Sequence, residues 1–373
     1  MNFDSKTIEH VADLLASSDL YYDTKRILIW KKESFRLLSD ILLNSNMKPF
    51  KFAKYSKLIY KYYTDVLNFP TDRPDICKEL IWKISVKSGI QDDEAIAQAL
   101  KSAEEFVKTR HINPPIIRIT PSPKKFTISI SGIYIEMPTH IASELLNRGW
   151  HHFCNLCLRY NVLGPSDGLF LSIDKDIYSY LEYTSKLNVV EGYASPFNYN
   201  LPKYCSIYKD DSVYNSLGPY KNYIQNLTYP VRFILNPPYT NRTMEECINL
   251  LLEYMDKYNG EFILMLPVMI DYDPIIRLLK YPNTYHKLTK GNTYTIHDHS
   301  KNKRILAPMD LIFVANIGGD IEKSKECVEE ITAYLSLLAE RIISKQNKTD
   351  ECKPWHKTNS LPETPIIARN CSK

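Results

Sequence analysis

Residues 231–239 read Val-Arg-Phe-Ile-Leu-Asn-Pro-Pro-Tyr, an apolar run that passes directly into an Asn-Pro-Pro-Tyr motif. The run 231–235 predicts a buried strand, and the two prolines after it cannot donate the hydrogen bonds that would extend it. Thr243, with Glu246 three positions later, forms a capping-box pattern that predicts the start of a helix. The motif should therefore lie at the carboxyl end of a strand, where open α/β sheets bind their ligands.

The chain around this motif alternates short β-like runs with helical ones. Strands are predicted at 187–193, 231–235, 261–266 and 309–317, and helices at 174–185, 243–258 and 322–345. This alternation predicts an α/β sheet with helices on both faces. We expect one α/β domain over 165–346 and a polar, flexible tail without periodicity over 347–373.

The first part of the chain has a different pattern, because its apolar residues recur at helical spacing up to about residue 110. Two alternating segments around Ser122-Pro123 predict a β-hairpin near 116–136. A long helix is expected from about Pro138 to Tyr160. Residues 1–160 are therefore predicted to form a mainly helical domain that contains one hairpin.

Composition limits the class of protein. With 373 residues, 44% of them hydrophobic, the chain can bury a full core and form two domains. The longest apolar run, Phe262 to Ile270, is far shorter than the roughly 18 residues that span a bilayer. No membrane span and no secretory signal are predicted, so we expect an intracellular protein of the nucleus or cytoplasm, and of the cytoplasm if it is viral. Cys154 and Cys157 form a C-x-x-C without a second ligand pair, which predicts buried helix thiols and no metal site.

The motif residues suit chemistry on the exocyclic N6 amine of an adenine. The lone pair of that amine is delocalised into the ring, so attack on a methyl sulfonium requires the nitrogen to become pyramidal. The Asn236 side-chain oxygen and the Pro237 carbonyl can each accept one N–H, which favours that change as positive charge develops on nitrogen. Pro237 and Pro238 fix the backbone, and the Tyr239 ring offers a stacking face for the base. The structural alternative is a turn stiffened by its prolines.

A second Asn-Pro-Pro tripeptide, Asn113 to Pro115, provides an internal comparison. It has no aromatic fourth residue, and it follows a charged helical stretch that ends at His111 instead of a strand. In a chain with 22 prolines, an Asn-Pro-Pro tripeptide can arise by chance. By itself it therefore predicts only a turn. The chemical interpretation of 236–239 depends on the aromatic residue, the preceding strand and the capped helix together.

Another segment follows a strand-like run and reads Glu-Gly-Tyr-Ala-Ser-Pro-Phe-Asn over 191–198. By itself it predicts an ordinary strand end with a Ser-Pro turn. Together with Lys-Tyr-Cys-Ser (203–206), Ser-Leu-Gly-Pro (216–219), Leu-Asn-Pro-Pro-Tyr (235–239) and Phe-Ile-Leu-Met-Leu-Pro (262–267), it resembles the cap-specific adenosine N6-methyltransferases. This is the family of the phosphorylated C-terminal-domain interacting factor of RNA polymerase II. The resemblance covers about 180 to 317.

The resemblance implies a Rossmann-like methyltransferase domain packed on a helical domain. It implies S-adenosyl-L-methionine as methyl donor and capped mRNA starting with adenosine as acceptor. By position, Asn236, Pro237, Pro238 and Tyr239 would be the catalytic residues. The donor pocket would be lined by Glu191, Ala194, Ser195, Pro196, Phe197 and Asn198.

Two departures from the family pattern affect these expectations. The four tryptophans do not form the paired signature of a WW domain, so the sequence does not predict binding to the polymerase tail. The fourth motif residue, commonly Phe in the family, is Tyr239 here, which keeps the stacking face.

A basic loop and two other substrates complete the predictions. Lys301, Lys303 and Arg304 are candidate RNA-binding residues, with a solvated loop as the structural alternative.

A strand-borne Asn-Pro-Pro-aromatic motif also serves N6-adenine methyltransferases that act on DNA or uncapped RNA. A third hypothesis is an RNA-binding scaffold that keeps the fold without catalysis.

Overall fold

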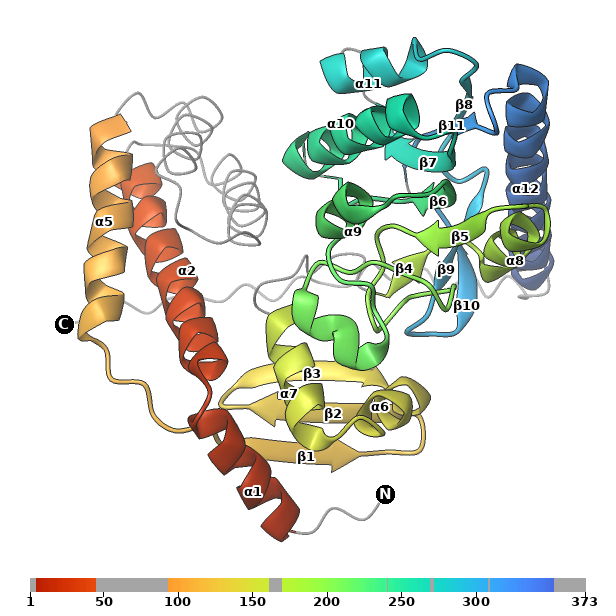
Figure 1. The fold of residues 1–373 in the computed structure, drawn as a ribbon. Coiled ribbons are helices and arrows are strands. Elements are labelled where there is room, and N and C mark those ends of the chain that lie inside the picture. Colours follow the sequence, from red (N-terminus) through yellow and green to blue (C-terminus); the bar gives the residue numbers. More distant parts are fainter. Residues whose placement is uncertain are drawn as a thin grey trace, which may run out of the picture.

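A computed structural model describes residues 5–44, 93–160, 170–239, 241–268, 272–307 and 309–351. In these residues, N-terminal helices, a small antiparallel sheet and a larger mixed sheet follow one another along the chain (Figure 1). The helical pattern predicted between 45 and 92 and the tail beyond 351 lie outside the described residues. None of the helices described is both long and apolar enough to cross a membrane.

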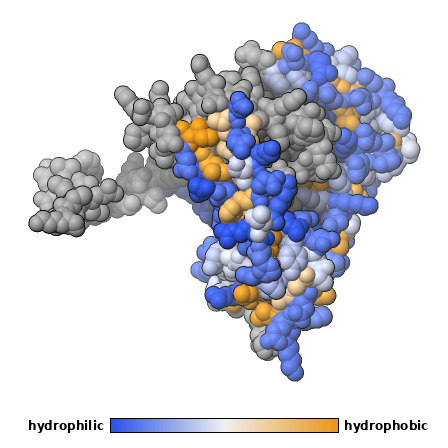
Figure 2. Space-filling view, turned by 90° about the vertical axis from the view of Figure 1, so that its left-hand side faces the viewer, coloured by the Kyte–Doolittle hydropathy of each residue, from blue (hydrophilic) through white to orange (hydrophobic). Residues whose placement is uncertain are grey.

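The N-terminal part contains the predicted helices, which are α1 (Ser5–Ala16), α2 (Asp19–Asn44) and α5 (Asp93–Thr109). On the side that α2 and α5 occupy, the described surface is mostly hydrophilic, with hydrophobic residues in separate patches (Figure 2). This is expected of helices that turn one apolar stripe inward.

The prediction of a two-stranded hairpin near 116–136 lacked one strand. The structure has a three-stranded antiparallel sheet there. The strands are β1 (Ile117–Pro121), β2 (Lys125–Ile130) and β3 (Ile133–Pro138), paired in the order β1-β2-β3. Ser131 and Gly132 have φ angles of 49° and 83°, so they form a tight turn inside the stretch that the sequence interpretation treated as one strand.

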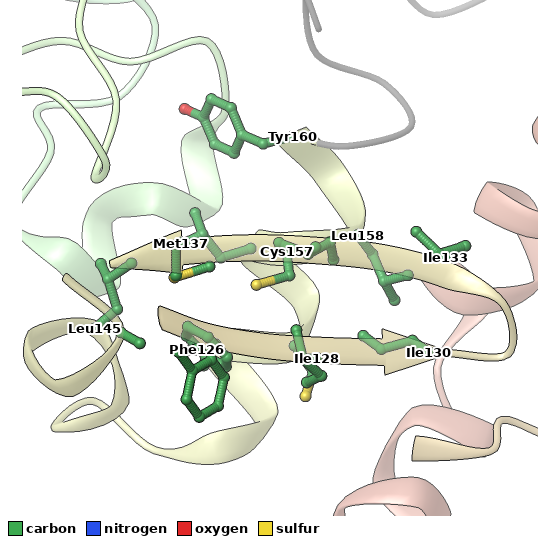
Figure 3. Close-up of a cluster of buried hydrophobic side chains, with 14 of the residues drawn as sticks. Phe126, Ile128, Ile130, Ile133, Met137, Leu145, Cys157, Leu158 and Tyr160 are labelled. Carbon is green, nitrogen blue, oxygen red and sulfur yellow. The ribbon is translucent and has the colours of Figure 1, made fainter. Parts of the chain in front are cut away.

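The long helix predicted before residue 160 is also two helices, α6 (Thr139–Leu146) and α7 (Trp150–Leu158). Gly149 separates them with a φ of 100°, which an α-helix cannot contain. The burial predicted for Cys154 and Cys157 is confirmed, because both thiols on α7 are fully buried and Cys157 packs among the apolar side chains of β2 and β3 (Figure 3). Desolvation raises the pKa of Cys154 to about 12, so its thiol stays protonated.

The larger sheet has the strand order β5-β6-β7-β11-β8. Its strands are β5 (Asn188–Glu191), β6 (Val231–Leu235), β7 (Glu261–Pro267), β11 (Leu311–Asn316) and β8 (Tyr285–Thr289). β5, β6 and β7 are parallel, whereas β11 runs antiparallel to both of its neighbours. The four predicted strands all belong to this sheet, and the edge strand β8 was not predicted.

Helices cover both faces of this sheet, as the alternating pattern predicts. On one face lie α9 (Tyr220–Asn226), α10 (Asn241–Lys257) and α11 (Asp273–Leu279), and on the other α8 (Lys175–Tyr183) and α12 (Ile321–Glu351) (Figure 1). β6 contributes Phe233 and Leu235 to the first core and Ile234 to the second. Helix α12 continues to Glu351, so the tail predicted from residue 347 begins too early.

Helix α12 forms side-chain contacts with both β8 and α8. The Glu329 carboxylate accepts a hydrogen bond from Tyr285 of β8 (2.7 Å) and pairs with Lys287 of the same strand. The adjacent Glu330 accepts a hydrogen bond from Tyr180 of α8. Two neighbouring residues of one helix therefore contact an edge strand and a second helix.

A small third sheet and a 3-10 helix complete the architecture. The sheet has the order β10-β9-β4, from β4 (Leu171–Ser172), β9 (Thr295–Asp298) and β10 (Lys303–Leu306). The 3-10 helix η2 (Lys209–Tyr214) contributes Tyr214 to the core of the N-terminal part, as does Phe197 from the loop after β5. The core of the N-terminal part therefore extends past residue 160, where the sequence interpretation placed a domain boundary.

Candidate functional site

The Asn-Pro-Pro-Tyr motif leaves the carboxyl end of a fully buried strand. All five residues of β6 are buried, and Asn236 is the first position with partial exposure. Pro237 is buried and Pro238 is partly exposed. The Tyr239 hydroxyl turns back and donates a hydrogen bond of 2.8 Å to the Asn236 side-chain oxygen. The first and last residues of the motif are therefore joined directly.

The Tyr239 ring lies where the two core layers of the mixed sheet meet. It packs against the apolar clusters on both faces and keeps partial exposure. Burial raises the pKa of Tyr239 above its ordinary range, so the hydroxyl stays protonated and can act as a donor. Tyr178 of α8 and Tyr294, which precedes β9, are close enough to Tyr239 for their hydroxyl pKa values to be raised further.

Glu191 ends the strand beside the motif, paired in parallel register with Ile234 of β6. Its buried carboxylate accepts the backbone N–H groups of Asn200 (2.8 Å) and Leu201 (3.2 Å) and a hydrogen bond from Tyr178. Desolvation nevertheless raises the pKa of Glu191 to about 7, because its partners are amides and a hydroxyl.

The loop after Glu191 is held mainly by its own polar groups. The Asn198 side-chain oxygen accepts hydrogen bonds from the Ser195 backbone N–H and hydroxyl, both 2.8 Å. Phe197 packs edge-on against Tyr160, with ring centroids 5.4 Å apart. Asn198 keeps partial exposure. The buried members of the predicted donor-binding set are Glu191, Ala194, Ser195, Pro196 and Phe197.

The structure brings two of the predicted groups together at one edge of the sheet. Because β5 and β6 are parallel neighbours, the loop that starts at Gly192 and the motif that starts at Asn236 leave the same edge side by side. The Gly192 N–H donates to the Ile234 carbonyl (2.9 Å), which continues the pairing up to the motif.

The predicted RNA-binding cations lie on the β9–β10 hairpin and the turn within it. Arg304 pairs with Asp174 and with Asp176 (2.6 Å), and Lys301 pairs with Asp298 (3.2 Å). Lys303 is exposed, and within the described part of the chain it has no ion pair. Two of the three cations therefore already have carboxylate partners.

Sequence reasoning missed the residues that support the motif from distant segments. Tyr178 and Asn200 hold Glu191, and Tyr294 lies buried near Tyr239. Tyr178 had a weak signal, because Ile177 and Leu181 beside it form the apolar stripe of α8. Tyr294 had none, since it follows a turn and its hydroxyl donates to the Met309 carbonyl (2.5 Å) only in the folded chain.

The second Asn-Pro-Pro tripeptide, Asn113 to Pro115, lies in different surroundings from the motif. Asn113 lies before β1 instead of after a strand, it is exposed, and its carbonyl accepts a hydrogen bond from Tyr21 (3.0 Å). It lies in an irregular connecting segment between α5 and β1. Across the described ranges, no cluster of three His, Cys, Asp or Glu side chains is arranged to hold a metal ion.

Together, fold and site define an α/β protein that carries Asn-Pro-Pro-Tyr at the carboxyl edge of a mixed sheet. Residues 142–291 match the family model described as "Phosphorylated CTD interacting factor 1 WW domain". This match confirms the resemblance to the phosphorylated CTD interacting factor 1 family that was found in the sequence. No curated protein matches the chain.

The matched range contains the candidate site. It runs from α6 past β8 and includes both β5 and β6 with the loops that follow them. The description names interaction with a phosphorylated CTD. The described residues of this range include the strands β5, β6, β7 and β8 of the mixed sheet and the helices between them.

Proposed function

We propose that this protein is an S-adenosyl-L-methionine-dependent methyltransferase that modifies the N6 amine of the adenosine next to an mRNA cap. One observation carries the proposal: the Asn236 side chain stands at the carboxyl end of β6, beside the loop that follows Glu191 on β5. Two loops leaving neighbouring parallel strands are the usual place for a cofactor and its substrate to meet. The match to this family model supports the choice of capped transcripts.

The strand order supports a Rossmann-like methyltransferase fold. β5, β6 and β7 are parallel, and β11 is inserted antiparallel between β7 and β8. A mainly parallel sheet with helices on both faces is the doubly wound arrangement, which binds cofactors at the carboxyl ends of its strands.

The residues at this edge fit a donor that carries a sulfonium. Aromatic faces attract cations, and both Tyr193 and Tyr239 keep partial exposure here. Asn236 places an amide group at this edge and is not buried, whereas the Asn198 amide is already bonded to Ser195 and to the Leu171 carbonyl. When bound, S-adenosyl-L-methionine supplies an electrophilic methyl group. Glu191, by contrast, would act by holding the loop in place, because its carboxylate is committed to Asn200, Leu201 and Tyr178.

The chain's own residues would position and polarise the amine. The Asn236 oxygen accepts one N–H, and the Pro237 carbonyl accepts the other. Both oxygens would stabilise the positive charge that develops on nitrogen as the N–C bond forms and the bond between the methyl group and the donor sulfur breaks. Neither oxygen has to remove a proton before the bond forms, because the extra amine proton would pass to water afterwards. The prolines limit movement of the Pro237 carbonyl, so little reorganisation is needed.

Mass spectrometry of nucleosides tests the activity and its substrate. The protein is incubated with labelled donor and, separately, with capped RNA starting with adenosine, the same RNA without a cap, and duplex DNA. We expect N6-methyladenosine at the first transcribed position of the capped RNA. Equal labelling of uncapped RNA or DNA would overturn the cap-specific assignment. No labelling of any substrate would overturn the enzymatic one.

The substitution Asn236→Ala tests the mechanism. Removal of one acceptor should lower kcat by about 100- to 1000-fold, as loss of one preorganised polar group does in other active sites. Donor affinity, measured by isothermal titration, should change less than twofold. Asn113→Ala, in the tripeptide that lies before β1, is the matched control and should keep parental kcat. Parental turnover in Asn236→Ala would contradict the assigned chemistry.

A further inference from the structure

The hydrogen bond within the motif uses part of the capacity of Asn236. An amide oxygen has two lone pairs, and the Tyr239 hydroxyl takes one of them at 2.8 Å. The second lone pair is left for a substrate N–H. The amide nitrogen, which can only donate, would repel an amine presented at the same place.

We propose that the Tyr239 hydroxyl is a positioning group that keeps the oxygen of Asn236, and not its nitrogen, facing the substrate amine. This inference rests on the proposed function, and it assigns to the hydroxyl a role separate from that of the ring. The chemistry of the pair carries it. A hydroxyl in this partly buried place needs an acceptor for its proton, and the amide nitrogen cannot provide one. The hydrogen bond therefore disfavours the flipped amide.

The same bond sets the ring and the oxygen in a fixed relation. Tyr239 lies three residues after Asn236, and two prolines of restricted φ separate them. A base stacked on the ring therefore meets an oxygen that is anchored to the edge of that ring. The ring itself is held by apolar contacts to both faces of the sheet. Acceptor and stacking face are thus aligned before the substrate arrives.

The substitution Tyr239→Phe tests the proposal, because it removes one oxygen atom and keeps the ring. We expect kcat on capped RNA to fall about three- to tenfold, the effect of one hydrogen bond of ordinary strength. Donor affinity and the KM for RNA should stay within twofold, because the ring still stacks. Tyr21→Phe is the matched control: it removes a buried hydroxyl that donates to the Asn113 carbonyl (3.0 Å), in the N-terminal part of the chain. It should keep parental kcat.

A second background separates orientation from packing. In Asn236→Asp, a carboxylate presents oxygen in either orientation, so adding Tyr239→Phe should cost less than twofold in kcat. An equal cost in both backgrounds would overturn the orientation role. So would a Tyr239→Phe enzyme with kcat within twofold of the parent, or one that loses donor affinity in parallel. Failure of the parent protein to methylate any adenosine would instead reject the proposed function itself.

Discussion

Glu191 is a buried carboxyl group whose protonation should affect stability. Its folded pKa of about 7 lies above the ordinary value of 4.5, because desolvation outweighs its hydrogen bonds. Folding therefore favours the protonated form. This contribution is fully present below about pH 4.5 and is lost as the pH rises through 7, a change of up to about 3 kcal/mol.

The substitution Glu191→Gln removes this titration and keeps the shape of the side chain. We expect the variant to unfold at a higher temperature than the parent at pH 8, and the difference to shrink as the pH falls to 5. Thermal unfolding followed by circular dichroism across this range measures it. Glu182→Gln, at an exposed position of α8, is the control. Parallel profiles of Glu191→Gln and the parent would show that Glu191 is already ionised without cost in the folded state.

At the scale of elements, the contact between β5 and β6 depends on a residue without a side chain. A Cβ at Gly192 would collide with the Leu235 side chain and lie 3.1 Å from the Tyr220 ring. Gly192→Ala should therefore destabilise the protein by about 1–3 kcal/mol through overpacking. Urea denaturation measures this, with Asn188→Ala at the exposed start of β5 as control. A change under about 0.5 kcal/mol would mean that the two strand ends can separate without cost.

How much the sequence predicts differs among elements for physical reasons. β6 and α10 were found because a mainly apolar run and a capped amphipathic pattern are both local signals. β8 was missed because His286 and Leu288 are exposed on this edge strand, so it has no continuous apolar pattern. The turn at Ser131-Gly132 and the break at Gly149 depend on positive φ angles, which single residues inside periodic stretches indicate weakly.

Some features of the candidate site could be predicted from local sequence, and others depend on tertiary contacts. Asn236 to Tyr239 could be predicted because the strand, prolines and aromatic residue adjoin in sequence. The hydrogen bond between its ends and the network around Glu191 depend on tertiary contacts, which no spacing indicates. The segment predicted to hold the donor leaves the same edge of the sheet as the motif, and most of its side chains are buried.

On the scale of the whole molecule, a buried ion pair joins the two parts of the chain. Arg159, after α7, pairs at 2.9 Å with Asp211 of η2, which also accepts a hydrogen bond of 2.6 Å from Tyr160. Both ionic side chains are almost fully enclosed. Asp211→Ala should cost about 3–5 kcal/mol, because it leaves the guanidinium charged and buried without its partner.

The neighbouring Asp210 provides a matched control for this prediction. Its side chain is 75% exposed and lies 3.7 Å from Arg159, so Asp210→Ala should change stability by less than about 1 kcal/mol. Urea denaturation followed by tryptophan fluorescence compares the two variants. Similar small losses in both would show that the guanidinium finds other partners once Asp211 is removed.

Helix α12 has a mechanical consequence for the way in which ligands enter. Glu329 is hydrogen-bonded to β8 and Glu330 is hydrogen-bonded to α8. These contacts hold α12 against the other elements on its face of the sheet. Bending of the sheet on that face would break the contacts of α12 with β8 and with α8 together. Movements that admit the proposed donor and transcript should therefore come from the loops that follow β5 and β6, while the strands beneath them stay rigid.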